Sequence, residues 1–330
     1  MKSSEITKTI CRVSIRILYS IPVILSVITI GFILLKLAPG DPAVLLAGEA
    51  ATPQYIENVR KIYGLDKPLW EQYFIYIEKA LRLDLGYSLS YKRPVLEVIL
   101  ERFPYTLLLA VSGVSIGFIL GVGLGIISAW YRKKLINPLI SNISFVLYST
   151  PVFVIGQFLI YYFAIVLKAF PVGGVVTIGL THGGFLAYVA DVLWHLTLPS
   201  LTLGLIFMAS YVKLTKSSFI EVLSSSYILA SRSLGLRNST ILFKHAFRNA
   251  IIPILTLAGA QLSMLVGGVI ITESMFSWPG IGQLTMEAVS TRDHPLLLGV
   301  FFFTSITVVV INIVIDFLYS VVDPRIKERL

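Results

Sequence analysis

Few residues of this chain could do chemistry, and one string among them has a catalytic spacing. Gly113-Val-Ser115-Ile-Gly117 matches the Gly-x-Ser-x-Gly pattern of a nucleophile elbow. Such an elbow needs a strand before the serine and a helix after it. Here the string lies inside a long apolar run, where small residues at this spacing favour close packing of helices. We therefore expect the small residues of this string to form a helix-packing surface and not a catalytic site.

The chain also lacks the patterns that bind nucleotides and metals. A phosphate-binding loop requires Gly-x-x-x-x-Gly-Lys-Ser/Thr, and none of the 24 glycines is followed by lysine. The four histidines have no metal-ligand spacing, and a single cysteine excludes a cysteine-based zinc site. The sequence therefore predicts no catalytic residue, metal or cofactor in this chain, and no ATP hydrolysis by the chain alone.

Polar side chains inside apolar runs are the remaining candidates, since such positions are costly and often functional. Asp316 lies near the end of the last apolar run. Gln157 and Gln261 could line a polar pathway, or form hydrogen bonds between helices. Neither an arginine ladder nor a chain of buried carboxylates is present, which suggests that a partner supplies the energy for any transport.

The elements that position these residues follow from composition. Of the 330 residues, 56% are hydrophobic and 14% are charged, whereas a soluble domain carries about 25% charged residues. This balance excludes a disordered chain and speaks against a soluble enzyme. Six apolar runs reach the roughly 20 residues that a spanning helix needs. They are Ile17–Leu37, Leu107–Trp130, Ile140–Leu167, Leu196–Val212, Ile251–Ile271 and Leu296–Val322. The sequence therefore predicts an all-α polytopic membrane protein with six transmembrane helices.

The positions of the basic residues predict the orientation of these helices. Sixteen lysines and arginines fall in the segments that would be internal, against Lys168 and Arg292 in the short external connections. Since internal loops carry the basic excess, both termini are expected in the cytoplasm. The net charge of +9 then needs no nucleic acid to explain it. Val172–Trp194 is interpreted as an external connection with a short surface helix; if it spanned the membrane, everything after it would change sides.

Four regions result from this organisation. Residues 1–38 hold the N-terminal cytoplasmic end and the first helix, and residues 39–102 form an external helical segment that could seat another protein or rim a vestibule. Residues 103–322 hold a core of five helices, with a long internal loop at 213–250. Residues 323–330 form a cytoplasmic tail.

The internal loop is too long for a tight connection and keeps a helical apolar periodicity. Gly235 can adopt a positive φ and end a helix, and Asn238 or Ser239 can cap the next one. The loop is therefore expected to form two short helices along the membrane face. From these residues alone, docking of another protein and contact with anionic lipid are equally favoured.

Several strings of the chain resemble one family. The internal loop carries Tyr227-Ile-Leu-Ala-Ser-Arg-Ser-Leu-Gly235-Leu and then His245-Ala-Phe-Arg-Asn-Ala-Ile-Ile-Pro253, which resemble the EAA loop of ABC-importer permeases. More narrowly, they are similar to the dipeptide/oligopeptide/nickel permease family. Further matching strings occur in the same order, at Ala38–Pro42, Gly64–Ser88, Arg93–Val95, Glu273–Gly282, Arg292–Asp293 and Asp323–Arg325.

The resemblance implies a type I ABC-importer permease fold and assigns roles to individual residues. The loop residues that would couple to an ATPase are Tyr227, Ala230, Ser231, Arg232, Leu234, Gly235, His245, Arg248, Asn249 and Pro253. The residues of structural motifs are Pro39, Gly40, Asp41, Trp278, Pro279, Gly280, Gly282 and Asp316. The stretch 226–234 would be a coupling helix, moved as a rigid body when the ATPase closes.

The resemblance also implies partners and a function. The partners would be a second, homologous permease, two cytoplasmic ATPase subunits that bind ATP and Mg, and an extracytoplasmic solute-binding protein, all at a multi-pass permease in the cell (plasma or inner) membrane. Peptides are the expected substrate, with nickel chelates or oligosaccharides as alternatives within the same class. An intramembrane enzyme or an ion-coupled carrier is the remote alternative. The exact substrate, the residues that line the pathway and the partner permease are left open.

Overall fold

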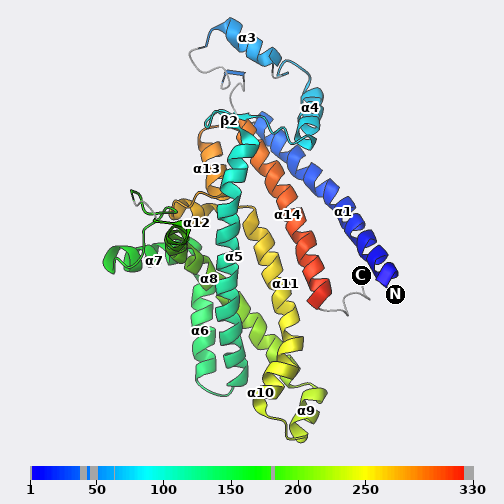
Figure 1. Ribbon diagram of the computed structural model, residues 1–330, viewed down its shortest axis with the longest axis vertical. Helices are drawn as coiled ribbons and strands as arrows, with labels where there is room; N and C mark the ends of the chain where they lie inside the picture. Colours follow the sequence, from blue (N-terminus) through cyan, green and yellow to red (C-terminus); the bar gives the residue numbers. More distant parts are fainter. Residues whose placement is uncertain (1, 38–42, 45–50, 63, 180–182, 323–330) are drawn as a thin grey trace. The chain divides into compact units, whose positions relative to one another are not determined.

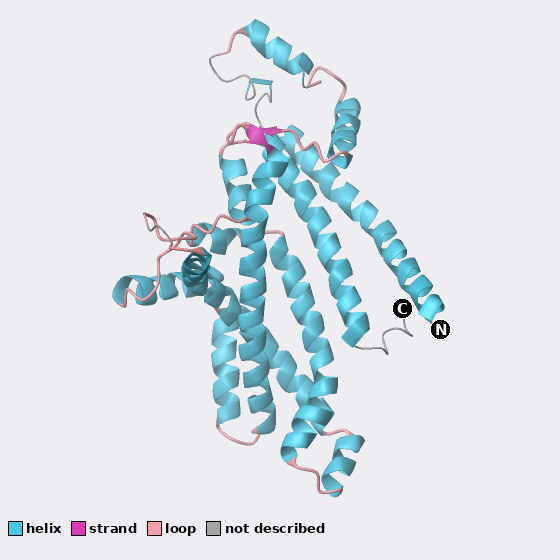
Figure 2. Ribbon diagram, in the orientation of Figure 1, coloured by secondary structure: helices cyan, strands magenta, loops and turns pink. Residues whose placement is uncertain are grey.

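The structure is a computed structural model that describes residues 2–37, 43–44, 51–62, 64–179 and 183–322. These residues are mostly helical and include one small hairpin (Figures 1 and 2). The helices are α1 (Lys2–Leu37), α3 (Pro53–Ile62), α4 (Leu69–Leu81), α5 (Val95–Trp130), α6 (Ile136–Ser149), α7 (Val152–Leu159), α8 (Phe185–Leu223), α9 (Ser226–Ser233), α10 (Asn238–Thr240), α11 (Phe247–Val266), α12 (Ile270–Met275), α13 (Ile281–Ser290) and α14 (His294–Val322). Two π-helical segments are η1 (Ile160–Val166) and η2 (Ile241–Ala246), and the strands are β1 (Tyr87–Ser88) and β2 (Arg93–Pro94).

The chain divides into two compact units. The first unit comprises Met1–Pro104 and Leu284–Ile313, and the second comprises Tyr105–Gln283 and Val314–Leu330. The loop 213–250, predicted to be internal, lies in the second unit, and the hairpin β1–β2 lies in the first unit.

Long apolar helices fit a multi-pass membrane protein. Four of them in the described residues are long and apolar enough to cross a membrane: Val95–Trp130, Phe185–Leu223, Asn238–Val266 and His294–Ile315. A fifth crossing results if α6 and the α7–η1 helix are taken together as one bent span. The first predicted helix is α1, whose apolar described part is the shorter stretch Leu18–Ile33. Helix thus covers most of each predicted span, while the count of six and the cytoplasmic termini stay predictions. The predicted span Ile251–Ile271 runs past the end of α11 at Val266, and α12 begins only at Ile270.

The prediction of one continuous helix over Ile140–Leu167 is wrong. The structure has two helices there, Ile136–Ser149 and Val152–Val166, bent by 103°. The break falls at Thr150, whose ψ is 128°, and at Pro151, which precedes α7. Proline lacks an N–H donor and pushes the residue before it out of the helical region. Hydrophobicity alone does not register this backbone effect.

In its described residues, 172–179 and 183–194, the segment Val172–Trp194 contains no separate short helix. Residues 185–194 are instead the first turns of α8, which runs without a break to Leu223. The loop before α8 is tied to the helix by Thr177, which donates to Asp191 from its backbone nitrogen at 2.7 Å and from Oγ1 at 2.9 Å. This region is therefore a loop folded onto the start of a long helix.

In the second unit, α8 contacts α6, α7, α11 and α12 and so forms the centre of its helix packing. It also meets α5 along a row of glycines spaced four residues apart: Gly113, Gly117, Gly121 and Gly125. A methyl group at Gly117 would lie 2.8 Å from Phe207 Cβ, and one at Gly125 would lie 2.5 Å from Thr215 Cβ. Glycine lets the two backbones approach. The Gly-x-Ser-x-Gly string is thus part of a helix-packing surface, and Ser115 itself is exposed.

This close approach predicts opposite effects for two neighbouring glycines of α5. Gly121→Ala should lower the free energy of unfolding by about 1–3 kcal/mol, because overpacking forces backbone shifts. Its methyl would lie 2.7 Å from the carbonyl oxygen of Met208. Gly123→Ala is the matched control, since a methyl there meets nothing within 4 Å; it should leave stability equal or slightly raised. Thermal unfolding of the purified variants would distinguish them, and equal melting temperatures would contradict the tight α5–α8 contact.

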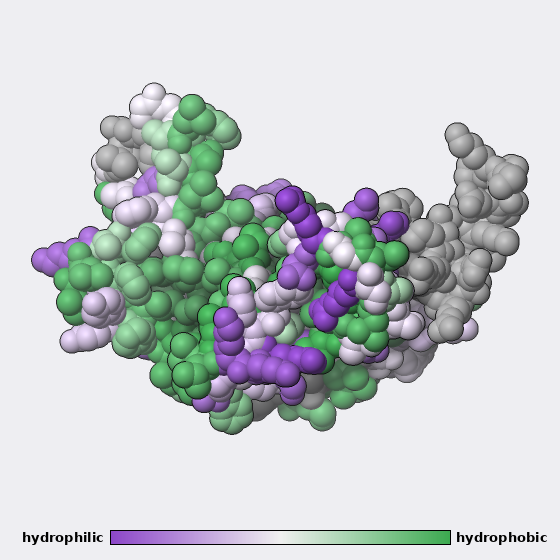
Figure 3. All heavy atoms as spheres, turned by 90° about the horizontal axis from the view of Figure 1, so that it is seen from below, coloured by the Kyte–Doolittle hydropathy of each residue, from purple (hydrophilic) through white to green (hydrophobic). Residues whose placement is uncertain are grey.

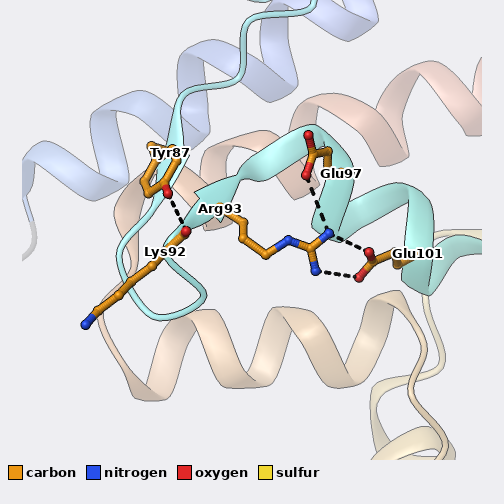
Figure 4. A network of polar contacts seen from close by, with 5 residues as sticks. All are labelled: Tyr87, Lys92, Arg93, Glu97 and Glu101. Carbon is orange, nitrogen blue, oxygen red and sulfur yellow. Dashed lines mark hydrogen bonds and ion pairs between the residues drawn. The ribbon is translucent and has the colours of Figure 1, made fainter.

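The first unit carries a small β-hairpin. β1 and β2 pair antiparallel, with Tyr87 opposite Pro94 and Ser88 opposite Arg93. The Tyr87 hydroxyl donates to the carbonyl oxygen of Lys92 across the turn (Figure 4). The Arg93 guanidinium forms ion pairs with Glu97 at 3.4 Å and Glu101 at 2.5 Å on the first turns of α5 (Figure 4). Because all three side chains are exposed, we expect the pairs to orient the hairpin more than they stabilise it.

Candidate functional site

The short helix α9 of the internal loop is held by one residue and exposes nearly all the others. Ile228 is fully buried in a cluster with Ala129 of α5, Phe219 of α8, Ile241 and Ala246 of η2 and Ala250 of α11. Its neighbours Tyr227, Leu229 and Leu234 are 41%, 53% and 80% exposed. A single anchor thus seats α9 on the ends of three long helices and leaves an outward face of small and apolar residues.

The end of α9 has the geometry that the sequence predicts for Gly235. This glycine has a φ of +73°. Its N–H donates to the carbonyl of Arg232 at 2.9 Å, and the N–H of Leu236 donates to the carbonyl of Ser231 at 3.3 Å. This pair of bonds is the Schellman motif, which ends a helix through a residue in the left-handed region. The direction in which the chain leaves α9 therefore depends on the backbone of one glycine.

The expected start of the next helix is wrong in detail. Arg237, and not Asn238 or Ser239, occupies the position before α10, and no side chain caps the helix. The short α10 also does not stand alone, because it continues through the π-helical turn of η2 into α11. The second loop helix is thus the first part of the long helix Asn238–Val266.

The other predicted coupling residues lie around α9 on the same unit. Asn249 Nδ2 donates to the Tyr227 hydroxyl at 2.8 Å, which joins the two quoted strings directly. Ser231 Oγ donates to the carbonyl of Tyr227 at 2.8 Å. Ala230, Arg232, Arg248 and Pro253 are exposed, and His245 is half-buried. The structure therefore gathers these residues at one end of the unit.

Basic side chains surround this surface. The exposed ones at this end of the second unit are Arg132, Lys133 and Lys134 of the α5–α6 turn, and Arg232, Arg237, Lys244 and Arg248 of the loop. Figure 3, which is seen from the end where α9 and α10 lie in Figure 1, shows hydrophilic side chains gathered on an otherwise hydrophobic face. A basic rim around a small apolar helix suits an acidic protein partner or an anionic membrane surface.

A buried glutamate organises the turn that follows α11. Glu273 is fully buried. Its Oε1 accepts from Thr106 Oγ1 at 2.8 Å and from the Val269 N–H at 3.4 Å, and its Oε2 accepts from the Gln283 N–H at 2.9 Å. The carboxyl group thus joins α5, α12 and the start of α13 in the second unit.

The predicted motif residues Trp278, Gly280 and Gly282 enclose this carboxyl group. Trp278 is fully buried and its Nε1 donates to the carbonyl of Tyr105 at 2.9 Å. A methyl group at Gly280 would lie 2.5 Å from Glu273 Oε2, and one at Gly282 would lie 2.9 Å from the same atom. The glycines of the Trp-Pro-Gly-Ile-Gly string therefore make room for the glutamate. Pro279 lies between Trp278 and Gly280 in this turn.

Burial also changes the acidity of this group. Removal from water raises the pKa of Glu273, and the hydrogen bonds from Gln283, Thr106, Val269 and Gly282 offset part of that rise. In the sequence, Glu273 lies just beyond the apolar run Ile251–Ile271, and none of its neighbours indicates that it is buried. The signal that could have found it is a lone acid followed, within ten residues, by a tryptophan and two glycines.

A second buried acid, Asp293, plays a comparable role in the first unit. It directly precedes α14, and its Oδ1 accepts from the N–H of Leu296 at 3.1 Å, which is the bond of an N-cap. Its Oδ2 accepts from Ser88 Oγ at 2.6 Å and from the Ser90 N–H at 3.0 Å. One carboxylate therefore caps a long helix and fastens the β1–β2 hairpin to it.

Replacing Asp293 by alanine should release the hairpin. The loss of an N-cap costs about 1 kcal/mol, and each buried donor left without an acceptor costs about 1–3 kcal/mol. We expect faster hydrogen exchange over residues 87–94, measured by mass spectrometry on the purified protein. Arg93→Ala, which removes only the exposed ion pairs of the same hairpin, should leave that exchange nearly unchanged; equal exchange in the two variants would contradict the role of Asp293.

The remaining predicted residues are not brought into one site. Gln157 is exposed on α7, and Gln261 is half-buried on α11, with its Oε1 buried and without a hydrogen-bond partner among the described residues. Pro39, Gly40 and Asp41 lie outside the described residues, as does the tail 323–330, and the side chain of Asp316 is likewise outside the described part. The structure therefore leaves the residues of a pathway as predictions.

Solved structures show what class of protein has this fold. A chain of the inward-facing MetNI methionine ABC transporter matches with a TM-score of 0.54 at 15% identity, over 69% of this chain and 97% of that chain. A second crystal form of that transporter matches with a TM-score of 0.55 at 16% identity, over 68% of this chain and 96% of that chain. The fold is therefore that of an ABC-transporter permease, as the sequence predicts.

The particular family follows from the sequence comparison. Residues 121–328 match the binding-protein-dependent transport system inner membrane component, and residues 10–110 match the N-terminal part of such components. The probable peptide ABC transporter permease protein y4tP of Sinorhizobium fredii is 38% identical over 90% of this chain and 92% of its own length. The glutathione transport system permease protein GsiC of Escherichia coli (strain K12) is 37% identical over 95% of this chain and 98% of its own. The chain belongs to the family of binding-protein-dependent transport system inner membrane components.

Family membership confirms several predictions made from the sequence. The chain is a multi-pass permease of the inner membrane and a transport component, not an enzyme. It works with a solute-binding protein and with ATPase subunits that hydrolyse ATP.

Proposed function

We propose that this chain forms one half of the translocation pathway of an ATP-driven importer of peptides, with a second, homologous permease forming the other half. Two cytoplasmic ATPase subunits bind ATP and Mg and dock on α9, and an extracytoplasmic binding protein delivers the solute. The coupling residues are those of the two quoted strings, from Tyr227 to Gly235 and from His245 to Pro253.

The observation that carries this proposal is the way α9 is seated. Its anchor Ile228 packs on residues of α5, α8 and α11, so a displacement of α9 is passed to three long helices at once. A rigid helix on a packed core transmits displacement, because packed cores switch between discrete arrangements and do not deform continuously. ATP shifts the conformation only if it binds one state more tightly than the other.

Docking on α9 can be tested by cross-linking. Cys11 is the single cysteine, so Cys11→Ser gives a clean background for Leu234→Cys on the exposed end of α9. Leu186→Cys on the first turn of α8 is the matched control, because Leu234 and Leu186 are 80% and 82% exposed. We expect the first to cross-link to an ATPase subunit in membranes and to react with thiol reagents from the cytoplasmic side alone. Labelling of position 234 from outside would overturn the proposal.

Peptides are the proposed substrate because relatives at 37–38% identity, which match nearly the whole chain, are named for peptide and glutathione transport. Glutathione is itself a tripeptide. The test is calorimetric binding by the partner solute-binding protein with di- and tripeptides, glutathione, nickel chelates and oligosaccharides. Binding of a nickel chelate or a sugar, with no binding of peptides, would overturn peptides as the proposed substrate. It would leave the proposed coupling mechanism unaffected.

A further inference from the structure

The first unit contains a cavity of about 220 Å³ between α4 and the apolar helices α1 and α14. The lining comes from the end of α1, the turn before α4, the helix α4, the segment 84–89 and residues 292–298 around the start of α14. Its walls are largely apolar, with Phe32, Leu65, Ile75 and Leu298 among the lining residues. The proposed transport function does not use this cavity.

The charges around the cavity are mostly positive. Lys36, Lys79 and Arg292 line it, against the single acid Asp84 among the lining residues. Asp84 Oδ1 accepts from the N–H of Gly86 at 3.2 Å. Neither Lys79 nor Arg292 forms a side-chain hydrogen bond or ion pair with the part of the chain that the structure describes. The cavity therefore offers two cations without an ion-pair partner in the described residues, beside an apolar wall.

The cavity lies where two membrane helices meet water. The apolar described part of α1 ends at Ile33, and Phe32 and Lys36 line the cavity. At the other side, the candidate span His294–Ile315 begins with lining residues His294 and Pro295. Both helices thus place the cavity at the level of a bilayer surface, where lipid phosphates lie and lysine and arginine anchor helices.

Contacts between α4 and α1 keep the external segment at this level. Tyr73 OH and Thr29 Oγ1 share a hydrogen bond of 2.6 Å, and Lys36 Nζ donates to Gln72 Oε1 at 2.6 Å. On the other side of α4, Trp70 and Phe74 are 65% and 62% exposed. Exposed aromatic side chains of this kind are typical of the membrane interface.

We propose that this cavity binds the headgroup of an anionic phospholipid. The phosphate would lie between Lys79 and Arg292, the glycerol would face Phe32 and Leu298, and the acyl chains would follow the exposed apolar side of α1. A free phosphate ion would use the cations but not the apolar wall. The lipid would join α1, α4 and α14 of the first unit at the membrane surface.

The test uses the full chain with the subunits that copurify with it, delipidated in detergent. Native mass spectrometry measures binding of dioleoyl phosphatidylglycerol and, separately, dioleoyl phosphatidylcholine. We expect clear preference for phosphatidylglycerol, lowered roughly 30-fold by Lys79→Gln with Arg292→Gln, since each cation near a lipid surface contributes a similar, separate factor. The control variant, Lys61→Gln with Arg82→Gln, removes two exposed cations of the same unit that lie outside the cavity. It should leave the binding of phosphatidylglycerol unchanged.

Three results would overturn the proposal. They are equal binding of both lipids, equal losses in the cavity and control variants, and displacement of phosphatidylglycerol by millimolar inorganic phosphate, which would make the cavity a free-anion site. Because Lys79 and Arg292 are exposed, the variants should fold, and Lys79→Gln alone should give an intermediate loss. None of these results bears on docking at α9, which is a separate question in the second unit.

Discussion

Replacing Gly235 by valine is expected to lower substrate-stimulated ATP hydrolysis by the assembled transporter about tenfold. A side chain in the left-handed region costs about 1–2 kcal/mol, and more when it is β-branched. A methyl group at this position meets no atom within 4 Å, so the penalty arises from the backbone conformation and not from a clash. When α9 leaves its orientation to relieve this strain, the fraction of permease with an ATPase subunit docked on α9 falls to about a tenth, since 1.4 kcal/mol is a factor of ten.

Two further variants separate this effect from a general loss of stability. Gly235→Asn should keep most of the stimulation, because asparagine tolerates the left-handed region. Gly123→Val places the same side chain at an exposed position of α5 with no atom within 4 Å and should leave coupling intact. The measurement is ATPase activity in reconstituted membranes with and without loaded binding protein. Full stimulation in the Gly235→Val complex would show that the orientation of α9 does not determine docking.

The features that could be predicted from the sequence depend on local chain chemistry. Apolar runs of bilayer length become helices because lipid offers no partner for backbone groups. Gly235 ends α9 because glycine alone reaches a positive φ without strain. The spacing of Gly113 and Gly117 predicts close helix contact, and the structure places Leu203 and Phe207 of α8 against them.

The features that could not be predicted depend on residues far apart in the chain. Glu273 accepts from Thr106, which is 167 positions away, and Asp293 accepts from Ser88, which is 205 positions away. An isolated acid near a helix end is usually solvated, so nothing in its neighbours predicts complete burial. The bend at Thr150–Pro151 is different, because proline is a local signal for the end of a helix. A prediction based on the length of the apolar run alone does not take this signal into account.

Removing the carboxyl group of Glu273 should cost more than any other single change considered in this chain. Glu273→Ala leaves the Thr106 hydroxyl and the N–H groups of Gln283 and Val269 without their acceptor. Thr106 Oγ1 in turn accepts from the Ile281 N–H at 2.7 Å. The chain of hydrogen bonds from α13 through α5 therefore also loses its final acceptor. With about 1–3 kcal/mol for each stranded donor, we expect a loss of about 3–5 kcal/mol, a large part of the usual stability of a domain.

A graded series makes this expectation specific. Glu273→Gln keeps the shape of the side chain but turns an amide donor toward one of the N–H groups. It should therefore lower the free energy of unfolding by about half as much as Glu273→Ala. Gly280→Ala should lose about 1–3 kcal/mol by overpacking, because its methyl would lie 2.5 Å from Glu273 Oε2. Glu221→Ala, at an exposed position of α8, is the control, and its free energy of unfolding should stay within about 0.5 kcal/mol of the original value.

Thermal unfolding of the purified complex, followed by tryptophan fluorescence, should give melting temperatures that fall in the order Glu221→Ala, Glu273→Gln, Glu273→Ala. A melting temperature of Glu273→Ala equal to that of the control would mean that the buried carboxyl group does not hold the turn between α12 and α13 together.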